Sequence, residues 1–299
     1  MMKQEDLILG IDIGGSHITV GFVDLNTREI VQKSYFRAFI NSWGEATDII
    51  AAWTAIIEQA FATVNITEKK IGIAMPGPFD YEAGISYIKG NKKYDSLYGL
   101  NIKQLLAQRL NIPTANILMF NDAECFLKGE VFAGAALNSK KAIALTLGTG
   151  LGTAVYNNGV AADGELWNSP MMDGIAEDYI STRWFLKEYF DRTGINIANV
   201  KALNDICGVS GVARAVFKLF AENLAVFLES FIEKEHPDVI VIGGNITKAS
   251  LRFMPHLLSC LNKKDIHIPI EITELGELAP LFGAASYWVN NTYHLQDTE

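Results

Sequence analysis

Apolar and polar residues in the first 40 positions follow the pattern of consecutive β-strands. Three runs rich in β-branched residues succeed one another with only short turns between them: LILGIDI (7–13), ITVGFVD (18–24) and EIVQKSYFR (29–37). Such runs are typical of strands. Parallel neighbours need a long crossover, and these intervals leave no room for one. The pattern therefore predicts an antiparallel meander.

A helix and a buried strand are expected after the meander. Ser42 and Glu45 have the spacing of a capping box, which would start the helix. Apolar residues then recur every three or four positions, as on one helix face: Ile49, Trp53, Ile56, Ala60 and Val64. KIGIAMP (70–76) is a buried-type strand that ends in a Pro-Gly-Pro turn. The order of elements is β-β-β-α-β.

The second half of the chain repeats this opening in outline. AIALTLGTGLGTAVYNNG (142–159) is again a strand, a glycine turn and a strand. Aligning the two halves places Asp12-Ile13-Gly14 on Thr146-Leu147-Gly148, which is the weak internal similarity that a duplication leaves. The pattern indicates two similar α/β lobes.

The remaining pattern completes the two lobes. A helix is predicted over 211–235, and VIVIGGNI (239–246) is another apolar strand that closes on two glycines. We expect an N-terminal lobe over 1–120, with a late helix at 280–295 packed back on it. A larger C-terminal lobe should span 121–279 and face the first across a cleft.

Composition excludes several classes of protein. The 299 residues carry a formal net charge of −9, which disfavours a nucleic-acid partner because phosphate backbones need a basic face. Cys125, Cys207 and Cys260 lie far apart, which fits neither a disulfide framework nor a zinc site. The start MMKQEDLILG lacks the pattern of a secretion signal, and no apolar run is long enough to cross a bilayer. We expect a cytoplasmic protein with no membrane partner.

Three glycine turns are candidates for binding phosphates. Gly14-Gly15, Gly148-Thr149-Gly150 and Gly243-Gly244 each follow a strongly apolar strand. Backbone N–H groups at such turns can approach an anion without obstruction by a Cβ. Each turn alone fits a simple tight turn equally well, but three in one chain favour a nucleotide site. The P-loop pattern does not occur, and GTGLGT has the wrong spacing for a dinucleotide fold.

Asp12 lies beside the first of these turns. A carboxylate at the end of a buried strand is costly unless it is paired or near a metal ion. A structural cap for the Gly-Gly turn is the simpler interpretation. We favour a role near magnesium and phosphate.

Six segments spread over nearly the whole chain follow a familiar order: IDIGGSHITVGFVD, GIAMPGPFD, FNDAECFLKGE, LTLGTGLGTAVYNNG, VIVIGGNI and FGAASYW. Taken together and in this order, they resemble the ROK family of bacterial sugar kinases and repressors. The resemblance implies an α/β protein with the two-lobe, actin-like and ribonuclease-H-like ATPase fold and a central cleft. It further implies an ATP-dependent hexose kinase that uses ATP with magnesium.

The resemblance assigns the nucleotide site to the three glycine turns. Asp12 would lie near the magnesium ion and the γ-phosphate of ATP, and Gly243 and Gly244 would lie against the adenosine. The phosphates of ATP would be held by a larger group: Gly14, Gly15, Gly148, Thr149 and Gly150.

Asn121 and Asp122 match an Asn-Asp pair of the family, in which the aspartate is the catalytic base. Chemistry supports this assignment, because phosphoryl transfer to an alcohol needs an acceptor for the hydroxyl proton. The alternative is that Asp122 caps the helix that starts near Ala123. The same resemblance places Asn121 and Gly77 among the sugar-binding residues.

The segment from Glu165 to Glu177 departs most from the family. Glu165 and Glu177 match two sugar-binding glutamates of the family, and Asn168 replaces a histidine. The family's cysteine-rich zinc segment is absent between them, so we expect no zinc. Packing of Trp167, Pro170, Met171 and Met172 should hold the loop instead.

The choice of acceptor stays open at this point. Glucose is the expected substrate, with an N-acetylhexosamine or fructose as alternatives of the same family. A non-catalytic, sugar-sensing ROK protein is a further alternative. A repressor is disfavoured, because the first strand begins near residue 7 and leaves no room for a DNA-binding segment. The resemblance also implies a homodimer.

Overall fold

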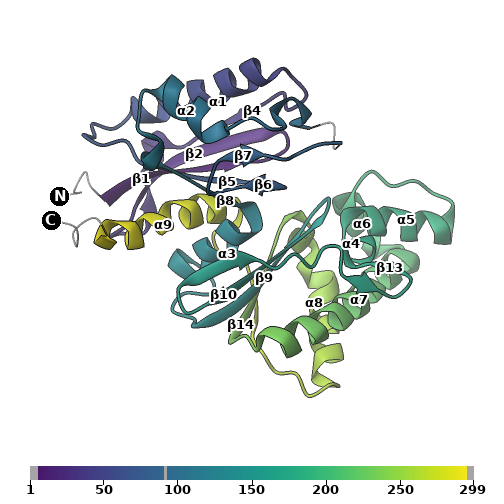
Figure 1. Ribbon diagram of the computed structural model, residues 1–299. Helices are drawn as coiled ribbons and strands as arrows, with labels where there is room; N and C mark the ends of the chain where they lie inside the picture. The colour runs from purple at the N-terminus through teal and green to yellow at the C-terminus, as the bar shows by residue number, and fades with distance from the viewer. Residues whose placement is uncertain (1–5, 91–92, 295–299) are drawn as a thin grey trace. The chain divides into compact units, whose positions relative to one another are not determined.

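The computed structural model describes residues 6–90 and 93–294, with the backbone alone for 290–294 (Figure 1). The chain forms two compact units. Unit 1 comprises the chain up to Leu137 and from Glu277 onward, and unit 2 comprises Asn138–Gly276. The fold is a mixed α/β, actin-like and ribonuclease-H-like two-lobe fold, as expected.

Unit 1 is built on one mixed sheet with the strand order β3-β2-β1-β5-β8, with β4 also paired to β2. β1 and β2 are antiparallel, whereas β1, β5 and β8 are parallel. The strands of this unit are β1 (Leu7–Ile13), β2 (His17–Asp24), β3 (Glu29–Ile30), β4 (Phe36–Phe39), β5 (Ile71–Met75), β6 (Phe79–Asp80), β7 (Ile85–Ser86) and β8 (Ile117–Asn121). Its helices are α1 (Ala46–Phe61), α2 (Ile102–Leu110), α3 (Asp122–Ala133) and α9 (Ala279–His294).

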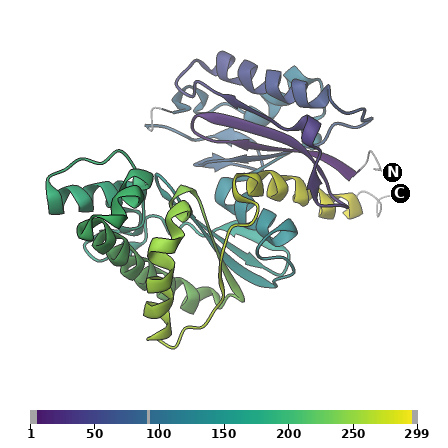
Figure 2. The ribbon, with the colours of Figure 1, turned by 180° about the vertical axis from the view of Figure 1, so that it is seen from behind.

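Two layers of helices cover the two faces of this sheet (Figure 2). α1 and α2 bury the main apolar core, in which Trp53 is fully buried. α9 lies on the opposite face, where Gly10 and Gly72 let its backbone approach the strands. A Cβ on Gly72 would overlap the carbonyl oxygen of Ala284. The glycines therefore set how closely the helix lies on the sheet.

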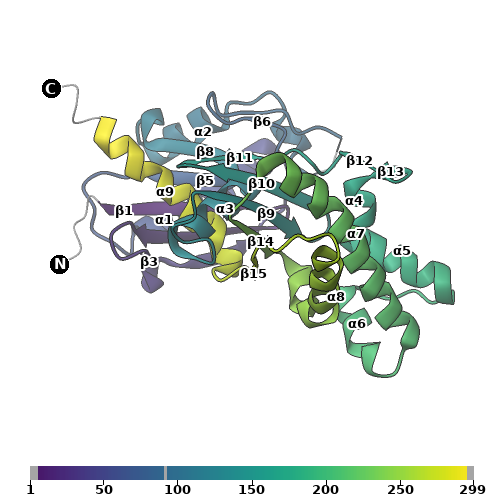
Figure 3. The ribbon, with the colours of Figure 1, turned by 90° about the horizontal axis from the view of Figure 1, so that it is seen from below.

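Unit 2 contains a five-stranded sheet with the order β11-β10-β9-β14-β15. A second core lies on one side of this sheet and includes apolar side chains of α7, α8 and α5, of which α5 packs on α7 (Figure 3). The strands are β9 (Lys141–Leu147), β10 (Leu151–Asn157), β11 (Val160–Asp163), β12 (Pro170–Met171), β13 (Gly174–Ile175), β14 (Val239–Gly243) and β15 (Ile270–Ile272). The helices are α4 (Ala176–Tyr179), α5 (Thr182–Thr193), α6 (Val200–Asp205), α7 (Gly211–Glu235) and α8 (Ser250–Asn262). None of the helices in the described part of the chain combines the length and the apolar composition that a membrane crossing requires.

The expected strand over 29–37 is wrong in detail. The structure divides it into β3 and β4, with a 3₁₀ turn at Gln32–Ser34 between them. The Ser34 hydroxyl accepts the backbone N–H of Phe22, so a side chain replaces part of the ladder there. Both short strands nevertheless pair antiparallel with β2.

The expected capping box at Ser42 is also wrong. α1 begins at Ala46, and its N-cap residue, Glu45, makes no side-chain capping bond. The Ser42 hydroxyl instead donates to the carbonyl oxygen of Gly15. The buried face of α1 includes Ile57 and Phe61, and Ile56 is only partly buried. Val64, which was expected on the same face, lies beyond the end of the helix.

The division between the units falls after α3 rather than at the expected residue 120. α3 stays with unit 1 because it packs backbone to backbone against α9. A Cβ on Gly129 of α3 would overlap the carbonyl oxygen of Ala279. Glu130, which follows it, is fully buried and accepts the N–H of Ala135.

Candidate active site

The carboxyl ends of β1, β5 and β8 meet at one edge of the unit 1 sheet. Asp12 is in register with Ala74 of β5, and Met75 is in register with Asn121 of β8. Because parallel strands end at the same edge, Asp12, Gly77 and the Asn121-Asp122 pair gather there. The structure thus brings together four predicted site residues from three separate stretches of the sequence.

Asp12 lies in an unusual electrostatic environment. Burial, reinforced by the carboxylate of Asp122, raises the pKa of Asp12 from 3.8 to about 7. The guanidinium of Arg37 opposes this rise. Asp12 is in register with Thr19, which is in register with Arg37, so all three side chains lie on one face of the sheet. Arg37 in turn forms an ion pair with Glu277.

Asn121, rather than Asp122, is the N-cap residue of α3. Its side-chain oxygen accepts the N–H of Ala123 at 2.8 Å and that of Glu124 at 3.1 Å. Its amide nitrogen donates to the Tyr81 hydroxyl at 3.4 Å. Asp122 is the first residue of the helix and keeps some exposure to solvent. Asp122 is therefore not the N-cap residue itself, although its carboxylate also accepts the N–H of Ala123 at 2.9 Å.

Gly77 lies just after β5, in a turn that Tyr81 closes. The Tyr81 hydroxyl donates to the carbonyl oxygen of Met75 at 2.9 Å. A Cβ on Gly77 would lie 3.3 Å from that hydroxyl. The glycine therefore leaves room for Tyr81 between the turn and Asn121.

The first glycine turn is held by Tyr94, which the sequence pattern did not single out, and by Ser42, which that pattern assigned to a helix cap instead. The Tyr94 hydroxyl donates to the carbonyl oxygen of Gly14 at 2.6 Å. The Ser42 hydroxyl donates to that of Gly15 at 2.8 Å, and the Ser42 carbonyl accepts the N–H of Tyr94. Local periodicity carries no signal for such contacts, because Tyr94 is eighty residues from Gly14.

The second glycine turn joins β9 to β10 and is held by Glu177 and Thr182. The Thr182 N–H donates to the carbonyl oxygen of Gly148 at 2.8 Å. The Glu177 carboxylate accepts the N–H of Leu151 at 3.0 Å and forms an ion pair with Arg183. It also lies against Gly150, where a Cβ would overlap it. The Glu177 carboxylate thus stabilises the second glycine turn.

Gly244 connects the third glycine turn to the second. Its φ of 87° lies in the left-handed region that favours glycine. A Cβ there would overlap the backbone of Leu147, the residue before Gly148. The ends of β9 and β14 therefore approach each other closely, and the two turns lie side by side.

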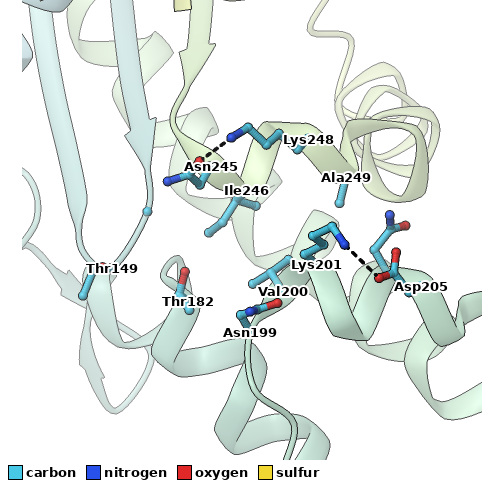
Figure 4. A pocket seen from close by; sticks show the side chains of 12 residues that line it. Thr149, Thr182, Asn199, Val200, Lys201, Asp205, Asn245, Ile246, Lys248 and Ala249 are labelled. Atoms are coloured by element: carbon cyan, nitrogen blue, oxygen red, sulfur yellow. Dashed lines mark hydrogen bonds and ion pairs between the residues drawn. The ribbon is translucent and has the colours of Figure 1, made fainter. Parts of the chain in front are cut away.

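A pocket of about 470 Å³ opens beside these two turns in unit 2 (Figure 4). This volume is typical of small-molecule sites. Two lysines belong to its lining: Lys201 contacts Asp205 at 3.4 Å, and Lys248 donates to Asn245 at 2.8 Å. The lining comprises Gly148, Thr149, Thr182, Asn199, Val200, Lys201, Asn204, Asp205, Asn245, Ile246, Lys248 and Ala249.

The sequence pattern indicates only part of the lining of this pocket. Gly148 and Thr149 were expected at a ligand site, whereas the contribution of α6 was not. Gly243 and Gly244 are not part of the lining, and the residues that follow them are. Asn199 is a signal in the sequence that could have indicated where α6 begins, because asparagine is a common N-cap residue. Its side chain caps α6 by accepting the N–H of Ala202.

Glu165 and Asn168 lie in an exposed loop between β11 and β12. Glu165 has a φ of 52°, in the left-handed region that non-glycine residues rarely adopt. Such strain persists where the surrounding structure enforces it and is frequent at functional sites. Here the N–H of Glu165 is held by Asp163 at 2.8 Å.

The expected apolar packing of this loop is largely wrong. Met171 is buried, but Trp167 is 47% exposed and Met172 is 63% exposed. Backbone hydrogen bonds hold the loop instead. The N–H of Glu177 donates to Trp167, and that of Ala176 donates to Ser169.

The residues at the unit 1 edge fit a magnesium ion that arrives with a nucleotide. Carboxylate oxygens are the ligands that Mg²⁺ prefers, and Asp12 and Asp122 are close enough for their charges to interact. Among the described residues, no group of three or more His, Cys, Asp or Glu side chains is arranged to hold a metal ion by itself. The absence of zinc stays a prediction.

Comparison with curated proteins finds sugar kinases. The chain is 26% identical over 274 residues to a glucokinase of Thermotoga maritima, which covers 81% of this chain and 83% of the relative. It is 24% identical over 264 residues to an N-acetyl-D-glucosamine kinase of Pectobacterium carotovorum, covering 80% and 83%.

Solved structures agree in fold. A ROK hexokinase from Thermus thermophilus has a TM-score of 0.80 at 20% identity, covering 96% of this chain and 99% of the other. A ROK glucokinase from Streptomyces griseus, solved with glucose and AMPPNP, has a TM-score of 0.76 at 22% identity, covering 94% and 98%. The family model described as ROK family matches residues 8–171, more than half of the chain. The chain belongs to the ROK family.

Proposed function

We propose that this protein is an ATP-dependent kinase that phosphorylates a hydroxyl group of a hexose, with glucose as the expected substrate. The observation that carries the proposal is the position of Asp122. It follows β8 at the edge where Asp12 lies, while the neighbouring Asn121 performs the capping. Asn121 already accepts the N–H groups of Ala123 and Glu124, so the bond that Asp122 also accepts from Ala123 at 2.9 Å repeats part of that capping.

Asp122 is the proposed catalytic base. Phosphoryl transfer is catalysed mainly by positioning and charge neutralisation, with a carboxylate to orient the attacking hydroxyl and accept its proton. The bond between the β,γ-bridging oxygen and the γ-phosphorus breaks as the sugar oxygen bonds to that phosphorus. ADP leaves, and the hydroxyl proton passes to Asp122.

ATP is the proposed phosphoryl donor, with magnesium bound to it near Asp12. The pocket of unit 2 has the volume for a nucleoside and lies beside Gly148 and Thr149, whose backbone can approach phosphates. The proposed phosphate contacts are Gly14, Gly15, Gly148, Thr149 and Gly150, with Gly243 and Gly244 near the adenosine.

The proposed sugar-binding residues are Gly77, Asn121, Asp122, Glu165, Asn168 and Glu177. Glu165 is the strongest of the group in unit 2, because its strained backbone is held in place and its side chain is exposed. The contacts of Glu177 with Leu151 and Arg183 leave less of its carboxylate for a ligand. N-acetylhexosamines and fructose are the alternative acceptors, since relatives of comparable identity are named for glucose and for N-acetylglucosamine.

An assay of ADP release over glucose, N-acetylglucosamine, N-acetylmannosamine and fructose tests the proposal. One sugar should support turnover, and Asp122→Asn should lower kcat by about 10²–10⁴-fold while sugar binding persists. Asp48→Asn is the matched control, because Asp48 also lies in the first turn of a helix but is exposed on α1. Sugar binding without turnover in the wild type would instead support a sugar-sensing protein.

A further inference from the structure

The first glycine turn is fixed from one side by two hydroxyl groups. Tyr94 donates to the carbonyl oxygen of Gly14, and Ser42 donates to that of Gly15. The Tyr94 side chain is 1% exposed and packs edge to face on Trp53, with ring centroids 5.6 Å apart. Tyr94 is buried, and Ser42 accepts the N–H of Tyr94 with its own carbonyl oxygen. Because both Gly14 and Gly15 carbonyl groups are hydrogen-bonded to these residues, the two peptide groups of the turn have little freedom to rotate.

The residue before Tyr94 extends its side chain over the same turn. The Nζ atom of Lys93 lies 2.8 Å from the point that a Cβ on Gly15 would occupy, and its Cδ atom lies 3.1 Å from that point. A residue with a side chain at position 15 would therefore displace the lysine. Lys93 itself is exposed, whereas the next residue, Tyr94, is buried.

The charge of Lys93 is not matched by a nearby carboxylate. Within residues 6–90 and 93–294, no carboxylate oxygen lies within 4.0 Å of its ammonium group. Lys70 of the same unit, by contrast, pairs with Glu68 at 3.0 Å. The N–H of Gly14 donates to the His17 carbonyl within the turn. A cation without a carboxylate partner, held over such a rigid glycine turn, can bind an anion there.

We propose that the Lys93 ammonium group binds the γ-phosphoryl group of ATP at the Gly14-Gly15 turn. This inference rests on the proposed kinase function and adds a residue to it. In the transition state, negative charge is spread over the oxygens of the transferred phosphoryl group. A lysine acts there as a point charge that neutralises part of it. Lys93 takes no part in proton transfer, which belongs to Asp122.

Binding measurements test this role without requiring turnover. Calorimetry with magnesium would compare ADP and a non-hydrolysable ATP analogue on the wild type, Lys93→Met and Lys89→Met. Lys89 is the matched control, because it is an exposed lysine of the same segment that lies over the ring of Tyr98. We expect Lys93→Met to raise the Kd of the ATP analogue by about tenfold or more and that of ADP by less than about twofold. The reason is that the charged hydrogen bond of Lys93 is made to the γ-phosphate, which ADP lacks.

Turnover supplies the second readout. Lys93→Met should lower kcat by about 10²-fold, and Lys93→Arg should recover part of the loss. Equal weakening of ADP and the ATP analogue, or behaviour like that of Lys89→Met, would overturn the proposal for Lys93. A wild type that binds ATP more tightly than ADP but phosphorylates no sugar would refute the kinase function, while the comparison of nucleotides still decides the role of Lys93.

Discussion

Gly283 of α9 lies directly against the carbonyl group of Cys125 in α3. A Cβ at position 283 would overlap that carbonyl oxygen, and Gly129 of α3 faces Ala279 of α9 in the same way. The two helices therefore touch backbone to backbone. Because α3 begins with Asp122, its contact with α9 helps to fix where the proposed catalytic base lies.

Gly283→Ala should destabilise the protein by about 3 kcal/mol or more, because the added methyl group has no space between two backbones. Urea unfolding followed by circular dichroism measures this. Gly208→Ala is the control, since a Cβ there meets nothing within 4 Å, and its effect should stay within about 0.5 kcal/mol. Similar midpoints for the two variants would contradict the close packing of α3 and α9.

Tyr94→Phe should lower the free energy of unfolding by about 1 kcal/mol, because it leaves the Gly14 carbonyl group without the buried hydroxyl. The first glycine turn should also loosen, which raises KM for ATP. Tyr98→Phe is the control. It also removes only a hydroxyl group from an aromatic ring, but Tyr98 is 49% exposed. If both variants have the wild-type KM, Tyr94 does not position the turn.

The raised pKa of Asp12 predicts that stability falls as pH rises. Its folded-state pKa is about 7 against an ordinary 3.8, so between these values the folded protein binds a proton that the unfolded chain has lost. Its contribution to stability therefore declines from about pH 4 to about pH 7 and stays low above that. Asp12→Asn should flatten this decline and exceed the wild type in stability at pH 8.

Urea unfolding at pH 5 and pH 8, with EDTA and without nucleotide, measures the effect. Asp48→Asn should retain the wild-type dependence, because Asp48 is exposed. A wild-type pH profile that Asp12→Asn leaves unchanged would show that Asp12 is ionised throughout this range.

Glu177→Ala should raise KM for ATP by about tenfold, because the N–H of Leu151 loses a charged acceptor beside Gly150. Arg183→Met should have a much smaller effect, since its ion pair with Glu177 lies on an arginine that is 65% exposed. Glu188→Ala is the control, as Glu188 pairs with Arg192 along α5. A change in KM for the sugar alone would show that Glu177 acts on the acceptor and not on the turn.

Much of the fold could be predicted because its signals are local. The strands at 7–13 and 18–24, the helix at 211–235 and the hairpin around Gly148 match the apolar periodicity of their own segments. Local patterns mislead where a contact between distant residues overrides local preference. Ser42 has capping-box spacing, yet its hydroxyl bonds Gly15, and the segment 29–37 is interrupted at Ser34.

The candidate site was predictable where a strand leads directly into a motif. Asp12 lies near the end of an apolar strand, and the glycine turns and Asp122 follow such strands. The parallel register gathers Asp12, Gly77 and Asp122 at one edge. Lys93, Tyr94 and the lining of the pocket by α6 carry no such pattern, and only contacts across many residues reveal them.

The sequence by itself determined the order of the elements and the residue types at their ends, because hydrophobic periodicity and turn chemistry act over a few neighbouring positions. Tertiary structure alone decided which of these ends meet, where α9 docks and which side chains hold each glycine turn. Those choices depend on backbone approach at Gly10, Gly72 and Gly283, and on hydrogen bonds between distant segments. These backbone approaches and long-range hydrogen bonds form only when the chain has packed.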